Sequence, residues 1–432
     1  MTDYIDVTYS VELTADPDIR AQDSMPDDLL EMGEIIAQEQ SVGGYDKPFH
    51  RDFDVEPYRA RATPNPSTGS VTVRFPTDNI APEPAHLLNY VAGDVFGSKY
   101  VEHIRVTDIS FPKPFVDRFP GPRFGQAGIR ERVDREGPLL GMILKPSLGL
   151  TPERIGDLVR AAAQPGAHLD DEPDDLGGVD IVKEDEKLTD PDYCAFEDRL
   201  DEVVAALRDV PEPPLYVLNV TAREDAFREY VAGHDLEDVL DRFVLLVTVI
   251  SHGFGRMQTL AEDDTLGLPT YAHRAGHAAL TRTAHGIEMR VLEQLSRLAG
   301  ADFAHCGAIA GNHRRDRAEV VTNRRVLDTT TPPWDGLEPC LPVVSGGVDP
   351  TNIKENMEAV GERDHQEQLV FMIGSGIYGH SGGTLPGIAA GVRANREAID
   401  AAREGLGHGD IETRVHHDYP HMEAWLEADR ED

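Results

Sequence analysis

The four consecutive residues Lys183-Glu-Asp-Glu186 carry the clearest potential for chemistry in this sequence. They follow a short apolar run, and alternate side chains of an extended strand face the same way, so Lys183 and Asp185 point together. Glu186 joins them if the chain turns there. Two carboxylates suit a hard cation such as Mg²⁺. A lysine ammonium beside them would repel that cation, whereas a lysine carbamate formed with CO₂ would add an anionic oxygen ligand.

A simpler interpretation of Lys183-Glu-Asp-Glu186 is a solvated run of charge, but its position favours a metal site. After the segment 111–124, short apolar runs alternate with amphipathic helical segments, and about eight such runs predict a (β/α)8 barrel. The runs are 139–144, 179–182, 215–220, 244–250, 268–272, 302–305, 342–345 and 369–373.

Active sites of this fold lie at the carboxyl ends of the barrel strands. In this sequence those ends carry polar or small residues, namely Lys145, Lys183, Asn219, His273, His305, Ser345 and Gly374. We therefore expect these residues, which are far apart along the chain, to meet at one end of the barrel.

The first part of the chain has a different pattern. Residues 7–13 and 70–75 alternate as half-buried strands do, and residues 25–37 and 86–92 carry helical apolar stripes. We expect a ferredoxin-like α+β domain over residues 1–116. The segment 111–124, rich in Pro, Gly and Phe, marks the boundary, and the α/β barrel domain with its C-terminal helices then takes residues 117–432.

The composition narrows the classes of partner. Asp and Glu number 78 against 41 Lys and Arg, a formal net charge of -37, which repels the phosphates of nucleic acids. No run of about 18 apolar residues predicts a membrane span, and the N-terminus lacks the basic and apolar regions of a signal peptide. We expect a cytoplasmic protein that binds neither nucleic acid nor membrane. The acidic, lysine-poor composition resembles that of halophilic proteins.

The segment Gly177-Gly-Val-Asp-Ile-Val-Lys-Glu-Asp-Glu186 resembles the carbamylated-lysine metal motif of the RuBisCO large-subunit superfamily, Gly-Gly-x-Asp-x-x-Lys-Asp-Asp-Glu. The resemblance implies that Lys183 carries a carbamate and binds Mg²⁺ together with Asp185 and Glu186. Glu184 replaces a family Asp that is not itself a ligand. It also implies the same barrel and N-terminal domain.

The segment Gly141-Met-Ile-Leu-Lys-Pro-Ser-Leu-Gly-Leu150 resembles the family pattern Gly-x-Ile-x-Lys-Pro-Lys-Leu-Gly-Leu. It places Lys145 on the lysine that handles the proton during enolisation. Ser147 replaces the family's second lysine, which helps to set the charge and position of the first. The alternative for Lys145 is a surface lysine with a buried stem.

Two further motifs imply contacts with a substrate. Tyr271-Ala-His-Arg-Ala-Gly-His277 resembles the family's His-Arg-Ala-x-His. It assigns Arg274 to a substrate phosphate, which a guanidinium binds through two hydrogen bonds, and His273 to a substrate hydroxyl or a proton transfer. In Phe303-Ala-His-Cys-Gly-Ala-Ile-Ala-Gly-Asn312, His305 matches a phosphate contact.

Asn312 stands where carboxylases of this family have the lysine of a mobile lid, and neutral Asn cannot supply that positive charge. The segment His313-Arg-Arg315 follows directly. One interpretation is that these residues compensate in part for the missing lid lysine. Their spacing differs from that of the lid lysine, however, so we expect all three to lie on the loop surface.

Two glycine-rich segments resemble the family's substrate loops, where backbone N–H groups bind a phosphate. They are Leu341-Pro-Val-Val-Ser-Gly-Gly347 and Gly374-Ser-Gly-Ile-Tyr-Gly-His-Ser-Gly-Gly383. The residues assigned to substrate are Ser345, Gly346, Gly347, Gly374, Ser375 and Gly376. Ser375 replaces a family glycine.

The N-terminal domain carries two segments that resemble family motifs. Ala37-Gln-Glu-Gln-Ser-Val-Gly-Gly-Tyr45 keeps Glu39 but has Gly44 and Tyr45 in place of a phosphate-binding Thr-Trp pair. Asp94 replaces an Asn that helps to hold substrate and metal. In this family such residues reach into the barrel of a second subunit, so the resemblance implies a homodimer or higher homo-oligomer with shared active sites.

From these replacements we expect a RuBisCO-like protein that enolises a phosphorylated keto-sugar or diketone, an Mg²⁺-dependent enolase or isomerase. One candidate reaction is the 2,3-diketo-5-methylthiopentyl-1-phosphate enolase step. The alternatives are a divergent archaeal-type ribulose-bisphosphate carboxylase, a sugar-phosphate decarboxylase or transcarboxylase, and a non-catalytic scaffold.

Overall fold

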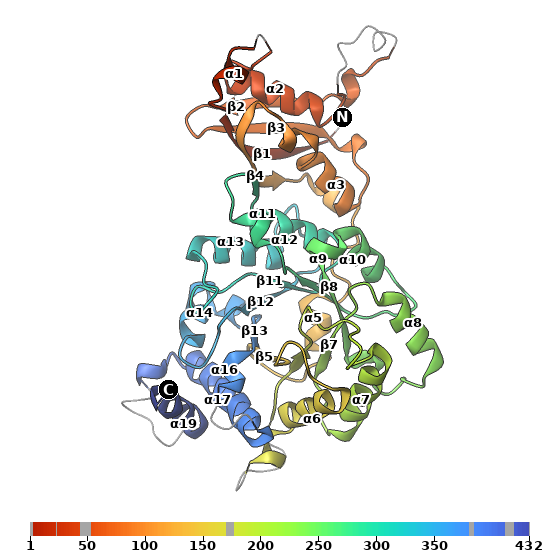
Figure 1. Ribbon diagram of the computed structural model, residues 1–432, viewed down its shortest axis with the longest axis vertical. Coiled ribbons are helices and arrows are strands. Elements are labelled where there is room, and N and C mark those ends of the chain that lie inside the picture. Colours follow the sequence, from red (N-terminus) through yellow and green to blue (C-terminus); the bar gives the residue numbers. More distant parts are fainter. Residues whose placement is uncertain are drawn as a thin grey trace.

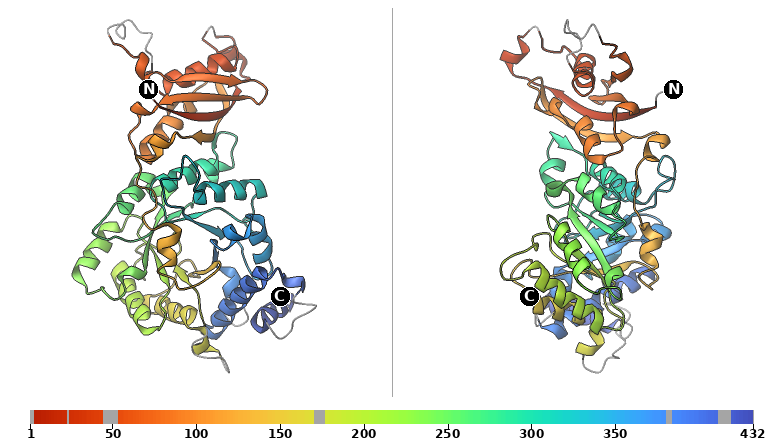
Figure 2. Two further views of the ribbon diagram at one scale, coloured as in Figure 1. Left: turned by 180° about the vertical axis from the view of Figure 1, so that it is seen from behind. Right: turned by 90° about the vertical axis from the view of Figure 1, so that its right-hand side faces the viewer.

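The computed structural model describes residues 3–22, 24–43, 53–169, 177–379, 384–410 and 419–431. Figure 1 shows two parts, a sheet with helices at the top and a barrel ringed by helices below it. Figure 2 shows the same arrangement from behind and from the side. No helix in the described ranges is long and apolar enough to cross a membrane.

The N-terminal domain is built on a five-stranded sheet. Its strands, in spatial order, are β10 (Gly286–Ile287), β4 (Val101–Ser110), β1 (Tyr4–Leu13), β3 (Ser70–Pro76) and β2 (Arg61–Asn65). The inner side chains of β1, among them Ile5, Val7 and Tyr9, are fully buried. The two-residue β10 comes from the barrel part of the chain and pairs in parallel with β4, so the sheet is completed by a distant segment.

Helices cover this sheet. They are α1 (Pro17–Arg20), α2 (Leu29–Glu39) and α3 (Pro84–Val91), with the short 3-10 helix η4 (Asp94–Gly97). Asp28 caps α2 by accepting hydrogen bonds from the backbone N–H groups of Leu30 and Glu31. Met32 and Ile36, one turn apart, point into the core. The helix expected over residues 25–37 therefore begins at Leu29, four residues later than expected.

The second part is a closed barrel of eight parallel strands in the order β11-β12-β13-β5-β6-β7-β8-β9. Their bounds are β5 (Leu139–Ile143), β6 (Ile181–Lys183), β7 (Leu215–Asn219), β8 (Phe243–Thr248), β9 (Thr270–His273), β11 (Phe303–His305), β12 (Leu341–Ser345) and β13 (Val370–Ile373). Each of the eight apolar runs overlaps one of these strands, and no bound differs by more than two residues. The predicted fold class, a (β/α)8 barrel with an N-terminal α+β domain, is confirmed.

Helices surround the barrel (Figure 1), and those from α6 to α15 lie along the chain between its first and last strands. They are α5 (Gly125–Arg130), α6 (Pro152–Ala163), α7 (Phe196–Asp209), α8 (Glu224–Gly233), α9 (Val249–His252), α10 (Phe254–Ala261), α11 (Ala278–Thr281), α12 (Met289–Leu298), α13 (Arg317–Asp328), α14 (Ile353–Ala359), α15 (Arg363–Gln366), α16 (Ser375–Tyr378), α17 (Leu385–Arg403) and α19 (Pro420–Glu431). The barrel interior is filled by its own apolar side chains, such as Leu215, Phe303 and Val343.

The segment 111–124 between the two parts is packed rather than extended into solvent. It contains α4 (Lys113–Val116), and Phe111, Phe115 and Phe119 are all buried. The rings of Phe111 and Phe115 stack with centroids 6.0 Å apart, and Phe111 meets the edge of Trp334 at 5.8 Å. The expected domain boundary at residues 116 and 117 remains a prediction.

A buried ion pair joins the strand that carries the metal motif to its covering helix. Glu184 follows β6, and its Oε1 accepts hydrogen bonds from Arg199 Nε of α7 at 2.7 Å and from the Tyr216 hydroxyl at 2.8 Å. The side chains of Glu184 and Arg199 have no solvent exposure. Removing one partner would leave the other as an uncompensated buried charge.

We therefore predict that Arg199→Ala lowers the free energy of unfolding by about 3–5 kcal/mol. Arg208→Ala is the matched control, because Arg208 lies on the same helix in an exposed ion pair with Asp238, and it should change stability much less. Urea unfolding followed by circular dichroism measures both. Equal losses in the two variants would contradict the assignment.

Helix α12 carries a second buried carboxyl group. Glu293 is 2% exposed, and its Oε1 has no hydrogen-bond partner among the described residues. Burial raises the pKa of Glu293 to about 8, although the positive charge of Arg274 opposes the shift. The native state therefore keeps a proton that the unfolded chain releases near pH 4.5.

This shift predicts a pH-dependent stability. Between about pH 4.5 and 8 the native state binds more protons at Glu293 than the unfolded state, so the free energy of unfolding falls as pH rises and levels off above pH 8. Glu293→Gln should remove this loss and be more stable than the wild type at pH 8 by roughly a few kcal/mol. Urea unfolding from pH 5 to 9, with exposed Glu355→Gln as control, tests it. Parallel pH profiles for wild type and Glu293→Gln would disprove it.

Candidate active site

A cavity of about 440 Å³ lies at the carboxyl end of the barrel strands. Twelve of the residues predicted from the sequence line it, which are Lys145, Lys183, Asp185, Glu186, His273, Arg274, His305, Ser345, Gly346, Gly347, Gly374 and Ser375. They come from six different strand ends, because parallel strands of a barrel all finish at the same rim.

Lys183 is the last residue of β6 and is only 1% exposed. Its Nζ donates a hydrogen bond to the carbonyl oxygen of Glu184 at 2.8 Å. Burial lowers the pKa of Lys183 to about 8, although the nearby carboxylates of Glu186 and Asp185 oppose the shift. A larger fraction of this amine is therefore uncharged, and so able to react with CO₂, than of an ordinary lysine.

Asp185 contacts the second lysine of the cavity. Lys145 Nζ lies 2.8 Å from Asp185 Oδ2 and 2.8 Å from Ser147 Oγ. Burial alone would raise the pKa of Asp185, but hydrogen bonds from Lys145 and Ser147 outweigh it and lower that pKa overall. Asp185 is therefore a carboxylate at neutral pH. Ser147, which replaces a family lysine, serves here as a hydrogen-bond partner of Lys145.

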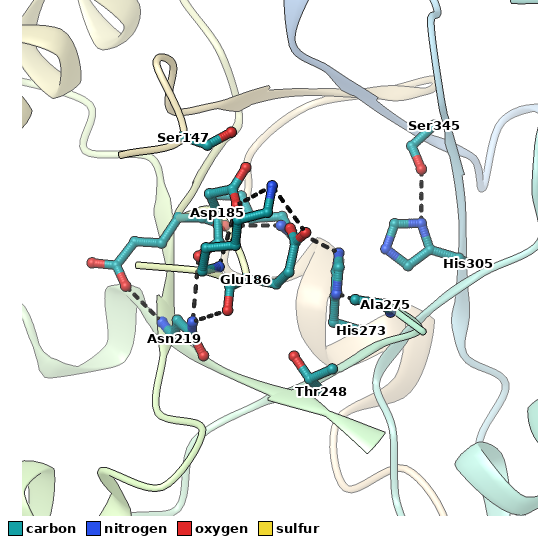
Figure 3. A network of polar contacts seen from close by, with 12 residues as sticks. Ser147, Asp185, Glu186, Asn219, Thr248, His273, Ala275, His305 and Ser345 are labelled. Atoms are coloured by element: carbon teal, nitrogen blue, oxygen red, sulfur yellow. Dashed lines mark hydrogen bonds and ion pairs between the residues drawn. The ribbon is translucent and has the colours of Figure 1, made fainter. Parts of the chain in front are cut away.

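Glu186 and His273 complete this side of the cavity. His273 Nε2 is 3.9 Å from Glu186 Oε2. Burial, with the positive charges of Lys183 and Arg274, lowers the pKa of His273 well below its usual value, so the ring is neutral at pH 7. Figure 3 shows Glu186 between Asp185 and His273.

Asn219, at the end of β7, holds the turn that follows Lys183. Its Nδ2 lies within hydrogen-bond distance of the carbonyl oxygens of Asp185, Glu186 and Leu188, at 3.3, 3.0 and 3.1 Å. The sequence analysis placed Asn219 at a strand end but assigned it no role. The structure shows it as the residue that positions the two carboxylates.

The first half of the metal motif is structural. A side chain at Gly178 would come within 2.2 Å of the Ala162 carbonyl oxygen, so only glycine fits there. Asp180 Oδ2 accepts hydrogen bonds from Arg396 Nη2 at 2.8 Å and from the Leu140 backbone N–H at 2.7 Å. These contacts hold β6 against β5 and α17.

The donor set fits Mg²⁺ only with a modified lysine. No group of three His, Cys, Asp or Glu that could hold a metal occurs in the described part of the chain. Two carboxylates, Asp185 and Glu186, stand beside the buried Lys183, and a carbamate on Lys183 would supply the missing anionic oxygen. Three oxygen-donating groups are the kind of set that Mg²⁺ prefers.

The other side of the cavity is made of cationic and hydroxyl groups. Arg274 Nη1 lies 3.4 Å from the carbonyl oxygen of His305. His305 Nδ1 is 2.8 Å from Ser345 Oγ, and its Nε2 is 2.9 Å from the Tyr271 hydroxyl. Burial, with the charge of Arg274, lowers the pKa of His305 well below its usual value. Figure 3 shows the His305–Ser345 pair away from the Asp185 cluster.

The glycine turns differ in their roles. Gly346 and Gly347 have φ of 113° and 87°, a conformation that favours glycine, and both line the cavity. Gly374 and Ser375 line it as well. Gly376 does not, because it lies beneath the turn, where its carbonyl oxygen accepts hydrogen bonds from Asn395 Nδ2 and Trp425 Nε1.

The two site residues expected in the N-terminal domain do not line the cavity of the same chain. Glu39 ends α2 and Asp94 begins η4. Gln40 joins these segments, since its Oε1 accepts a hydrogen bond from the Val95 backbone N–H at 3.3 Å. Glu39 and Asp94 therefore belong to one region of the N-terminal domain. Gly44 and Tyr45 lie outside the described residues.

The loop after β11 differs from expectation. Asn312 is exposed and does not line the cavity, whereas His313 and Arg315 do. The side chain of Arg315 is only 14% exposed. The expectation that Arg315 lies on the loop surface is wrong, because the loop folds back and turns this side chain inward.

Known proteins resemble this chain over most of its length. It is 34% identical over 367 residues to the ribulose bisphosphate carboxylase of Methanosarcina acetivorans, covering 79% of this chain and 78% of that protein. The dimeric archaeal Rubisco of Hyperthermus butylicus has a TM-score of 0.79 and 26% identity, over 98% of this chain and 95% of that chain. A rubisco-like protein from Burkholderia fungorum has a TM-score of 0.77 and 25% identity, over 98% and 99%.

These relatives overturn the expectation of a RuBisCO-like enolase. Curated archaeal relatives that are 31% and 34% identical carry the name ribulose bisphosphate carboxylase. The expectation rested on Asn312 in place of the lid lysine, together with the replacements at Gly44, Tyr45, Asp94, Ser147 and Ser375. Asn312 lies outside the cavity lining, and Arg315 of the same loop brings positive charge into it.

The model of the ribulose bisphosphate carboxylase large chain, catalytic domain, matches residues 127–423. The model of its N-terminal domain matches residues 21–115. The first match contains all eight barrel strands, and the second contains three of the four sheet strands before residue 116. This chain therefore belongs to the ribulose bisphosphate carboxylase large-chain family.

Proposed function

We propose that this chain is an archaeal-type ribulose bisphosphate carboxylase, which joins CO₂ to a phosphorylated keto-sugar. The observation that carries the proposal is the cavity itself. A buried lysine suited to carbamylation and two carboxylates stand on one side, and guanidinium, imidazole and hydroxyl groups stand on the other. The likeness to archaeal carboxylases supports the choice of reaction.

The chemistry that Mg²⁺ supplies, when held by the Lys183 carbamate, Asp185 and Glu186, is the polarisation of a substrate carbonyl oxygen. That polarisation acidifies the neighbouring C–H group. Lys145 is the group that moves this proton, because its Nζ stands beside Asp185 and its side chain is 35% exposed toward the cavity. The carbanion equivalent left on the substrate then forms the new bond to the carbon of CO₂.

The remaining polar groups bind and orient the substrate. His273 is neutral at pH 7, so its Nε2 can donate or accept a hydrogen bond with a sugar hydroxyl. Both ring nitrogens of His305 contact protein hydroxyls, so His305 orients the Ser345 hydroxyl toward the substrate. Arg274 suits a phosphate. At the opposite glycine turns, Gly346 and Gly374 leave the backbone open to a second phosphate, as anion-binding loops do.

A homo-oligomer with shared sites forms part of the proposal. Leu148 and Tyr193, large apolar residues in the segments that follow β5 and β6, are 48% and 44% exposed. Tyr193 OH accepts a hydrogen bond from the Gly149 backbone N–H, so these residues belong to one surface, which a second copy would cover. The family resemblance implies that Glu39 and Asp94 of the second copy reach the cavity, and the likeness to a dimeric archaeal Rubisco supports such an assembly.

The carbamate can be tested apart from activity. With ¹³C-bicarbonate and Mg²⁺, wild-type protein should show a carbamate carbon resonance by NMR that Lys183→Met abolishes. Lys113→Met is the matched control, because Lys113 has a 41% exposed side chain, pairs with Asp117 and does not line the cavity, and it should keep the resonance. A signal that survives Lys183→Met would disprove the assignment of the carbamate to Lys183.

The reaction is tested with ribulose 1,5-bisphosphate, Mg²⁺ and ¹⁴C-labelled CO₂, across a range of salt concentrations because the net charge is -37. We expect acid-stable label in the product. Lys145→Met should lower the rate by about 100-fold or more, since it removes the group that moves the proton, whereas Lys113→Met, outside the cavity, should not. Absence of label from folded, carbamylated wild type at every salt concentration would refute carboxylation.

A further inference from the structure

We propose that Arg315 is an anion-binding residue of the cavity, which holds a phosphate group of the substrate together with Arg274. Nothing in the sequence pattern assigned a role to Arg315. The inference rests on the proposed function for the identity of the ligand, a sugar bisphosphate. Its physical basis is the position, the partners and the charge of this one guanidinium.

The backbone of the loop fixes where Arg315 stands. Its N–H donates to the Ala308 carbonyl oxygen at 2.7 Å, which closes the loop on itself. The buried Asn356 accepts hydrogen bonds from two loop amides at 2.8 and 3.3 Å. The His313 N–H donates to the Gly346 carbonyl oxygen at 3.0 Å, which holds the loop on the glycine turn. The inward direction of Arg315 is therefore built into the loop.

The guanidinium of Arg315 has only weak partners in the described structure. Its Nη2 lies 3.5 Å from His277 Nε2, and its Nε lies 4.0 Å from the Glu319 carboxylate. His277 Nδ1 is already 3.0 Å from the Thr281 hydroxyl. A neutral imidazole and a distant carboxylate leave most of the donors of Arg315 available to a ligand.

The surrounding charge is strongly positive for so acidic a chain. In the whole sequence Asp and Glu outnumber Lys and Arg by 78 to 41. The cavity lining reverses this ratio even without Lys183, which a carbamate would make anionic, because Lys145, Arg274, Arg282 and Arg315 stand against the two carboxylates Asp185 and Glu186. Both carboxylates stand with the lysines, so the three arginines share a side of the cavity without a lining carboxylate.

The effect of these arginines appears at His277. Burial, followed by the positive charges of Arg274, Arg315 and Arg282, lowers the pKa of His277 to about 3. Three cations therefore act on one point of the cavity wall. A phosphate dianion placed there would relieve their mutual repulsion and accept paired hydrogen bonds from planar guanidinium groups.

The neighbouring Arg314 is the matched control. It has the same side chain and the same formal charge on the same loop, but it is exposed and does not line the cavity. An effect of net charge alone would be the same for the two positions. A direct contact with the ligand would be seen for Arg315 only.

Calorimetry in the presence of a chelator measures binding without turnover, with ribulose 1,5-bisphosphate and inorganic phosphate as probes. Arg315→Gln should weaken the Kd for the bisphosphate by about 10-fold to 100-fold, the loss expected for charge-assisted hydrogen bonds. Arg314→Gln should change it less than about threefold. Arg315→Lys should fall between wild type and Arg315→Gln, because it keeps the charge but not the fork geometry.

The outcomes separate this inference from the proposed reaction. If the wild type fixes CO₂ and Arg315→Gln binds the bisphosphate as tightly as the wild type does, the role of Arg315 is overturned and the proposed reaction stands. If the wild type fixes no CO₂ but Arg315→Gln alone binds the bisphosphate more weakly, Arg315 is an anion-binding residue and the proposed reaction is refuted. Equal losses in Arg314→Gln and Arg315→Gln, or no binding of either probe to wild type, would also overturn the role. Urea unfolding confirms that each variant is folded.

Discussion

Closure of the barrel is the constraint on which the rest of the structure depends. Residues 370–373 of β13 pair in parallel register with residues 139–142 of β5, which joins the last barrel strand to the first. Because every strand ends at the same rim, this pairing brings Gly374 beside Lys145, more than 200 residues earlier in the chain. Without closure, the lysine and carboxylate side and the arginine side would not face one cavity.

Because side chains alternate along β6, the segment Lys183–Glu186 both lines the cavity and holds the strand against the neighbouring helix. Lys183 and Asp185 face the cavity, whereas Glu184 points to the outside of the barrel and pairs with Arg199 of α7. The Glu184 carboxylate also accepts a hydrogen bond from the backbone N–H of Asn219, and the Asn219 side chain holds the following turn. The contacts that stabilise the back of the strand thus position the carboxylates at its front.

The loop after β11 explains why a single replaced residue was a poor guide to function. Asn312 occupies the position of the lid lysine along the chain, and its neutrality argued against carboxylation. In space, the loop packs so closely on the glycine turn that a side chain at Gly347 would come within 2.4 Å of the Asn312 backbone nitrogen. Asn312 then points away, and Arg315 and His313 face the cavity.

By itself the sequence determined the barrel, the position of the metal segment and most of the cavity lining. Local periodicity locates the strands, and the order of strand ends along the chain locates the polar residues. Because the closed barrel places all strand ends at one rim, these residues must lie around one cavity. Only the tertiary structure decided that Gly376 lies beneath its turn, that Glu39 and Asp94 lie outside the cavity of their own chain, and that Arg315 turns inward. The reason is physical. The direction of a loop side chain depends on hydrogen bonds to distant partners such as Asn356 and Gly346, which no pattern of neighbouring residues records.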